Sequence, residues 1–257
     1  MAANLSTPAL FLAHGSPMLA LEGGSWGQTL GAQGRALKGL RGVLVCSAHW
    51  ETPGPFHLTS APRPGILHDF SGFPDALFDL DYPALGSPLL ARKAADLLAT
   101  AGLDAVLEPR PLDHGTWVPL RYLLPDAEVP VVQLSLPRPR TPALLLAAGR
   151  ALAALRQTAV LIVGSGGIVH NLGRLDWAEA SGPRPWAEAF DSWVRAELAA
   201  GHDLSDWRTA PGAAESVPTS EHLDPLFVAL GAGGAPPEVL FDGWQLGSLS
   251  LTIYRFA

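Results

Sequence analysis

Along the chain, short apolar runs alternate with longer segments in which apolar positions recur at helical spacing. The apolar runs predict buried strands at residues 8–13, 42–48, 56–60, 105–107, 129–135, 159–163 and 248–256. The periodic segments predict helices at residues 87–101, 142–155, 184–200 and 221–230. Ser87 and Thr141 each stand directly before a proline at the start of such a segment, which is typical of an N-cap. Strands alternating with helices of this length predict an α/β fold, a central mixed, largely parallel sheet flanked by helices.

The length and composition indicate one folded unit. The chain has 257 residues, near the upper size of a single hydrophobic core, and 48% of them are apolar. A stretch rich in proline, glycine and aromatic residues at 61–88 is predicted to be a loop. The proline- and glycine-rich stretch at 210–218 is predicted to be a surface loop and not a domain boundary, because another functional-looking segment follows it. We therefore expect a single domain over residues 1–257.

Composition and charge argue against several classes of protein. No apolar run reaches the roughly 18 residues that span a bilayer. No basic segment precedes an apolar stretch at the start, so we expect a cytoplasmic protein. The net charge of −7 argues against a nucleic-acid partner. Cys46 is the single cysteine, which excludes an intramolecular disulfide and a cysteine-based zinc cluster; its place in an apolar run predicts a buried, unreactive thiol.

Two histidines stand at the ends of predicted strands. His14 ends the first strand, in the segment LFLAHGSP, and His49 follows the second, in VLVCSAHWE. In α/β sheets, ligands bind beyond the carboxyl ends of the strands. A single histidine there is usually structural, but neighbouring strands lie only about 5 Å apart, so two such imidazoles can share one metal ion. The pair therefore favours a metal site over two separate structural roles.

A third histidine follows a glycine-rich segment. The strand at 159–163 leads into residues 164–167 (Gly-Ser-Gly-Gly), and His170 comes three residues later. A phosphate-binding loop is one interpretation, but the spacing matches neither G-x-G-x-x-G nor the Walker pattern, and no lysine is near. Ser165 also lacks the G-x-S-x-G nucleophile elbow of a hydrolase. We expect the glycines to let the backbone pass close to a ligand that His170 faces.

His222 and His114 complete the set. Ser220 is predicted to cap a helix whose first turn holds Glu221 and His222, where a neutral, metal-bound imidazole is easier to explain than a charged one. Glu221 there has the simpler interpretation of favouring the helix dipole. His114 is flanked by Asp113, a carboxylate that could orient it, and is better suited to proton transfer or substrate binding than to the metal.

The aromatic stretch at 68–74, which begins with His68, is consistent with an aromatic pocket wall and equally with loop packing. His57 and His202 have contexts typical of ordinary surface or strand residues.

Together, the segments LFLAHGSP, VLVCSAHWET, HDFSGFP, LDHGTWVPL, LIVGSGGIVHNL and EHLDPLFVALGA resemble the class III extradiol ring-cleavage dioxygenases, in particular the 4,5-DOPA dioxygenase extradiol branch. The resemblance spans nearly the whole chain, in the family's order. It implies one catalytic domain over residues 1–257, a non-haem Fe(II) centre, and a catechol substrate into which both atoms of dioxygen are inserted. It also implies that members can be isolated with zinc.

The same resemblance implies roles for the histidines. His14, His49 and His222 correspond to metal ligands, His170 to a residue that is a metal ligand in this branch and an acid/base in related enzymes, and His114 to a second active-site histidine. We assign proton transfer to His170 first and to His114 second.

Non-haem iron oxygenases usually combine two histidines with one carboxylate. Here the third position is either His222, giving an all-imidazole site, or Glu221 in its place. An all-imidazole site also suits zinc, so a zinc hydrolase or amidase on the same scaffold is the main alternative. A non-catalytic member of the superfamily is a second alternative, which the retention of five histidines argues against.

Overall fold

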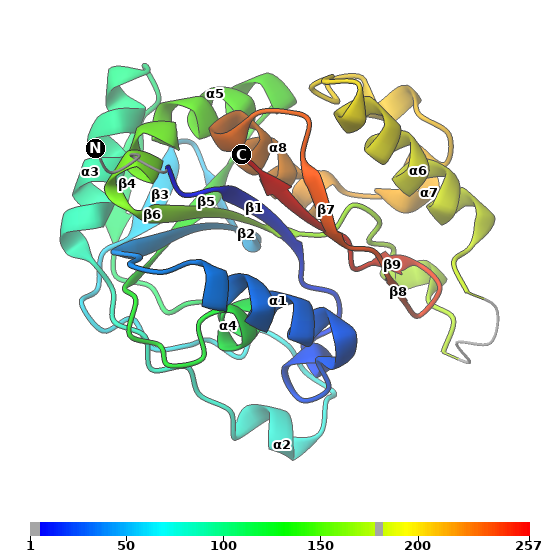
Figure 1. The fold of residues 1–257 in the computed structure, drawn as a ribbon, viewed down its shortest axis with the longest axis horizontal. Helices are drawn as coiled ribbons and strands as arrows, with labels where there is room; N and C mark the ends of the chain where they lie inside the picture. Colours follow the sequence, from blue (N-terminus) through cyan, green and yellow to red (C-terminus); the bar gives the residue numbers. More distant parts are fainter. Residues whose placement is uncertain (1–5, 178–181) are drawn as a thin grey trace.

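The computed structural model describes residues 6–177 and 182–257. Within them, an eight-stranded sheet forms the centre of the molecule, in the order β4-β3-β5-β2-β6-β1-β10-β7 (Figure 1). Its strands are β1 (Ala9–Ala13), β2 (Gly42–Pro53), β3 (Phe56–Thr59), β4 (Ala105–Glu108), β5 (Val131–Arg138), β6 (Val160–Gly166), β7 (Glu238–Phe241) and β10 (Ile253–Phe256). The strands β5, β2, β6 and β1 are mutually parallel, whereas β10 runs antiparallel to β1 and β7, and β3 antiparallel to β5. The predicted mixed, largely parallel sheet is confirmed.

Helices cover both faces of this sheet (Figure 1). The α-helices of the described residues are α1 (Gly24–Ala36), α2 (Asp75–Phe78), α3 (Pro88–Thr100), α4 (His114–Leu123), α5 (Pro142–Leu152), α6 (Pro185–Ala199), α7 (Ala213–Ser216) and α8 (Asp224–Gly233); α2 lies in a loop away from the sheet (Figure 1). Side chains alternate along each strand, so Phe11 packs into the core under α3, α5 and α8, while Leu10 packs into the core under α1 and α4. The candidate active site lies at the carboxyl ends of the strands, beyond these two cores.

Two of the longer helices, α1 and α4, were not predicted. The sequence of α1 contains several glycines, which are poor helix formers. These glycines allow close packing against α4: a Cβ on Gly34 would lie 1.7 Å from the carbonyl oxygen of Leu123. Helix α4 begins at His114 and contains Pro119, so its sequence also lacks a helical signature. Tertiary packing outweighs local preference in both.

Some other predicted boundaries differ from the structure. The single strand expected at 248–256 is two, β10 and the short β9 (Leu249–Ser250), which pairs with β8 (Trp244–Gln245) in a separate sheet. The loops expected at 61–88 and 210–218 contain the one-turn helices α2 and α7. The segments that Ser87 and Thr141 begin are capped as predicted, since each hydroxyl accepts a hydrogen bond from the amide three residues on. No helix in the described part of the chain is long and apolar enough to cross a membrane. The cytoplasmic location stays a prediction.

Candidate active site

His14 and His49 meet at the carboxyl edge of the sheet. His14 directly follows β1 and His49 lies on β2. These two strands were expected to be neighbours, but β6 lies between them. The register between β2 and β5 shifts between Cys46 and Glu51, so His49 has no partner on β5. The two imidazoles reach across the end of β6, whose last residues are small, and their Nε2 atoms are 3.0 Å apart.

A hydrogen bond on the far side of the His14 ring fixes which of its nitrogens carries the proton. The Ser165 hydroxyl donates to the carbonyl oxygen of Gly115, so it accepts from Nδ1 of His14, 3.0 Å away. Nδ1 of His49 faces the carboxylate of Asp69 at 3.6 Å, beyond hydrogen-bond distance. Nε2 of His14 therefore presents a lone pair toward Nε2 of His49, and a cation bound by both nitrogens would stabilise this arrangement.

His222 supplies the third imidazole. It ends the 3-10 segment η5 (Ser220–His222), which stands immediately before α8. Its Nδ1 lies 3.0 Å from Oε1 of Glu221, and its Nε2 is buried without a hydrogen-bond partner among the described residues. One ligand atom from each of His14, His49 and His222 lies within 4.8 Å of the others. Glu221 thus contacts the back of the His222 ring.

The local structure around His222 differs from the one predicted. Ser220 does not cap a helix that starts at Glu221: it begins η5, and its hydroxyl donates to Oδ2 of Asp224 over 2.9 Å. The helix begins three residues later than expected, at Asp224, because a 3-10 turn and Pro225 precede and open it. His222 therefore lies outside the α-helix.

The glycines near residue 165 bring the chain that carries His222 against β6. Gly164 and Gly166 belong to the strand, and the expected loop at these positions is wrong. A Cβ on Gly164 would lie 2.1 Å from the carbonyl oxygen of Pro225, and one on Gly166 2.0 Å from that of His222. The amide of Gly167 donates to the same His222 oxygen over 2.8 Å. The lack of side chains on Gly164 and Gly166 makes room for the backbone of the His222 segment, not for a ligand.

His170 lies against the cluster in a different way. Its ring stacks on that of His222, with the centroids 3.4 Å apart and the planes within 6° of parallel. An imidazole binds a metal in the plane of its ring, and two parallel rings stacked at this distance do not point at one common atom. The structure thus brings His170 to the site, where a ligand atom of its ring lies within 4.8 Å of one from Glu221 and one from His222.

His114 faces the same cluster from the start of α4. Its ring centroid is 3.9 Å from that of His49 and 5.5 Å from that of Phe70. Oδ1 of Asp69 lies 3.0 Å from Nδ1 of His114 and accepts the backbone amide of the same residue over 2.9 Å. The carboxylate expected to orient His114 was Asp113; this is incorrect, because Asp113 instead caps α4.

Burial favours the neutral form of four of the imidazoles, those of His14, His49, His170 and His222. Burial is the main cause that lowers the pKa of His14 and His222 well below the usual value, and it lowers the pKa of His49 to about 3 and of His170 to about 4. Burial alone would raise the pKa of Asp69, but the hydrogen bonds from His114 outweigh it and lower that pKa to about 2. A neutral imidazole is the form that binds metal.

The geometry fits one metal ion. Ligand nitrogens bound about 2.1 Å from an ion at tetrahedral or octahedral angles are about 3.0–3.4 Å apart. The separation of 3.0 Å between the Nε2 atoms of His14 and His49 matches this range. The unpartnered, buried Nε2 of His222 supplies a third ligand of the same kind. Three imidazoles suit zinc or iron(II), and the donor set contains no thiolate.

The remaining histidines lie elsewhere. His57 pairs with Glu108 over 2.7 Å and His202 with Glu197 over 2.5 Å, so neither contributes to the cluster, as expected. His68 packs against Phe70, Phe78 and Trp117. Since Phe70 in turn contacts His114, the aromatic stretch both packs the loop and borders the site.

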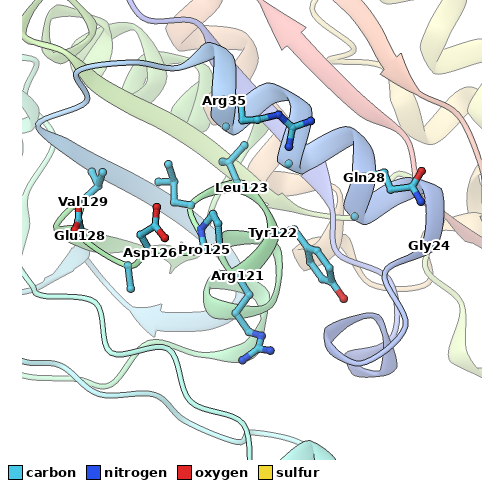
Figure 2. Close-up of a pocket in the computed structure, with 15 residues that line it drawn as sticks. Gly24, Gln28, Arg35, Arg121, Tyr122, Leu123, Pro125, Asp126, Glu128 and Val129 are labelled. Carbon is cyan, nitrogen blue, oxygen red and sulfur yellow. The ribbon is translucent and has the colours of Figure 1, made fainter.

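A cavity of about 580 Å³ lies away from the histidines (Figure 2). It is formed between the glycine-bearing side of α1 and the segment that includes Tyr122 and Pro125, at the end of α4. None of the eight histidines lines it. It is therefore separate from the candidate active site.

Comparison with known proteins agrees with this arrangement. Residues 8–257 match the family described as the catalytic LigB subunit of aromatic ring-opening dioxygenase. The protein is a member of the LigB family. This confirms the resemblance to extradiol dioxygenases that the sequence motifs indicated.

Individual relatives of this LigB protein are similar over most of their length. The 4,5-DOPA dioxygenase extradiol of Escherichia coli K12 is 41% identical, over 95% of this chain and 92% of the relative. The enzyme of the same name from Beta vulgaris is 36% identical, over 96% of this chain and 95% of its own. The crystal structure of an uncharacterized protein from Escherichia coli K12 has a TM-score of 0.83 and 34% identity, over 98% of this chain and all of the other.

Several residues of the site were missed from the sequence. Ser165 was considered only as a nucleophile, whereas it holds Nδ1 of His14. Asp69 was noted only within an aromatic stretch; its position directly after His68 gives no sign that it contacts His114. Arg140, described below, carries no motif at all. Each of these contacts is made between segments far apart in sequence, so local pattern could not reveal it.

Proposed function

We propose that the protein opens the ring of a catechol-type, DOPA-like aromatic substrate with dioxygen at a mononuclear metal site. The observation that carries this proposal is the convergence of His14, His49 and His222: one ligand atom from each lies within 4.8 Å of the others, and Nε2 of His222 is buried without a hydrogen-bond partner among the described residues. Membership of the LigB family and similarity to 4,5-DOPA dioxygenases support the reaction. In this proposal, residues 1–257 form one catalytic domain.

His14, His49 and His222 would hold the ion through Nε2. When bound, a divalent metal with open positions supplies Lewis acidity to the catechol oxygens and, as iron(II), the redox chemistry that dioxygen requires. We propose iron(II) as the active metal and zinc as a second ion that the all-imidazole set accepts. Glu221 would hold the His222 ring by accepting from Nδ1, as carboxylates do behind metal-bound histidines, and would not replace it.

His114 is placed to move the substrate proton. Because Asp69 accepts from Nδ1 of His114, the Nε2 atom is the free base that can take a proton from a catechol hydroxyl. The carboxylate would then stabilise the imidazolium that forms, and the proton would return to product oxygen as the ring opens. Ring opening adds both atoms of dioxygen to the catechol with no net change in protons, so each proton taken from the substrate is returned to the product.

For His170, the parallel stacking on His222 supports a role in proton transfer over that of a fourth metal ligand. If this is right, His170→Ala keeps its metal content and loses turnover, whereas His14→Ala loses both. Metal analysis of the two purified variants measures this. A His170→Ala protein without metal would make His170 a ligand.

Anaerobic reconstitution with iron(II), followed by oxygen uptake on a panel of catechols, tests the proposed function. We expect oxygen consumption and a yellow ring-opened product with iron, and none with zinc. The zinc hydrolase alternative predicts the opposite pattern: hydrolysis of ester or amide substrates by the zinc form, without oxygen uptake. Iron-loaded protein that consumes no oxygen with any catechol would overturn the proposal.

A further inference from the structure

Arg140 joins the two chain segments that carry His49 and His222. It lies between β5 and α5, and only 8% of its side chain is exposed. Its Nη1 donates to Oε1 of Glu51 over 2.6 Å, and its Nε donates to Oδ2 of Asp224 over 2.5 Å. Glu51 comes two residues after His49, and Asp224 two residues after His222. One guanidinium thus bridges a residue of β2 and the first residue of α8.

Both segments need such a tie, because regular structure holds them weakly. His49 stands in the stretch of β2 where pairing with β5 is interrupted. His222 stands on a 3-10 turn whose N-cap side chain makes no capping hydrogen bond. The backbone of η5 is fixed to β6 through Gly167, but that contact does not involve the His49 segment.

The charges in this bridge are mutually compensating. Asp224 is buried, and it also accepts from the Ser220 hydroxyl over 2.9 Å. Removing one partner of a buried charge pair leaves the other uncompensated, which is costly. Arg138 also lies 3.8 Å from Glu51, but it is 62% exposed, and exposed pairs of this kind contribute little. The buried ion-pair connection between the two segments therefore runs through Arg140, in addition to the direct packing of η5 against β2.

We propose that Arg140 is a positioning residue of the metal site, which sets the relative position of His49 and His222 through Glu51 and Asp224. This inference rests on the proposed function, because it takes those histidines as metal ligands. Arg140 itself touches neither metal nor substrate. Its planar guanidinium donates to the two carboxylates from two separate nitrogen atoms, whereas a lysine side chain has a single nitrogen.

Zinc affinity of the metal-free protein, measured by competition with a chromophoric chelator, tests the proposal without using activity. We expect Arg140→Met, Glu51→Gln and Asp224→Asn each to weaken zinc binding by about 10–100-fold, the usual effect of losing a residue that supports a ligand. Arg140→Lys should weaken zinc binding about as much as Glu51→Gln or Asp224→Asn, because it should keep the contact with only one of the two carboxylates. The spectrum of the cobalt(II) form should change in the same variants, because ligand geometry changes.

The double variant Glu51→Gln/Asp224→Asn provides the sharpest outcome. If Glu51 and Asp224 act together through Arg140, the loss of either carboxylate already removes the link between the His49 and His222 segments. The double variant then binds zinc no more weakly than whichever of the two single variants has the lower zinc affinity. Additive losses would mean two independent local effects and would overturn the bridge. These neutral, nearly isosteric substitutions keep the test valid even if Arg140→Met does not fold.

Arg156 offers a matched control. It is also buried and ties two distant segments, donating to the carbonyl oxygens of Thr7 over 2.5 Å and Ala232 over 2.6 Å, which lie seven residues before His14 and ten residues after His222. Arg156→Met should lose stability and keep its zinc affinity. Equal zinc affinity in the wild type and all Arg140-bridge variants would overturn the inference while leaving the metal site intact. A wild-type protein that binds no zinc or iron would overturn the proposed function itself.

Discussion

The two halves of the histidine cluster are held in different ways. His14 and His49 extend from strands of the central sheet, and the His14 amide donates to the carbonyl oxygen of Gly166 over 3.0 Å, so main-chain pairing fixes its position. His222 and His114 stand at a 3-10 turn and a helix start, and carboxylates orient their rings. His14 is thus positioned by backbone, whereas His222 and His114 are positioned by polar side chains. Substitutions should therefore affect the two halves differently.

The largest effects are expected where an imidazole is removed. His14→Ala and His222→Ala should each bind metal more than about 100-fold more weakly, beyond the range found for supporting residues, because each removes one of three ligands. Ring-opening activity should be lost with the metal. Metal content and circular dichroism of the purified variants measure this, and a folded variant with full metal content would contradict the ligand set.

His114→Ala should come next. Loss of a positioned general base typically costs about 10²–10⁴-fold in turnover, and we expect that loss with the metal content near normal. Asp69→Asn should reduce turnover less, because the imidazole remains but its Nδ1 partner changes. Steady-state kinetics on the iron-loaded protein distinguishes the two. If His114→Ala emptied the site, His114 would belong with the ligands.

Removing the side chain that contacts Nδ1 of each imidazole compares His222 and His14 directly. Glu221→Ala should weaken zinc binding by about 10–100-fold, because the side chain behind His222 is lost. Ser165→Ala removes the corresponding partner of His14, but the strand backbone still holds that residue, so we expect a loss of less than about tenfold. Chelator competition gives both values. Equal losses would mean that the backbone contributes nothing to the position of His14.

Cys46→Ala should have the smallest effect. Cys46 lies on β2 three residues before His49, but its thiol faces the core and not the site. Burial raises the pKa of that thiol, so it stays protonated and unreactive at neutral and mildly alkaline pH. We expect unchanged activity, no labelling of the native protein by thiol reagents, and a loss of about 1 kcal/mol in the free energy of unfolding. Rapid labelling at pH 8 would show the strand to be less tightly packed.

The same contrast explains what could be predicted from the sequence. Buried parallel strands are continuous apolar runs, so β1, β2, β5 and β6 and the histidines at the ends of the first two were visible as pattern. Helices α1 and α4 were not, because glycine packing and tertiary contacts maintain them against their local preferences.

Among the site residues, those whose role depends on a local strand end were found from the strand pattern, and those whose role depends on a contact between distant segments were not. Asp69 and Ser165 belong to the second kind. The stacking of His170 on His222 also depends on how two irregular segments meet, which no spacing in either segment encodes.

The close approach of α8 to β6 has a consequence for how the protein tolerates change. The carbonyl oxygens of His222 and Pro225 contact the strand where Gly166 and Gly164 have no side chains. At these two points the spacing between the strand and the segment from His222 to Pro225 is set by main-chain atoms. A single methyl group added to either glycine would push the two segments apart. Because the residues of α8 that face the strand are themselves buried, tolerance to mutation is low on both sides of this contact.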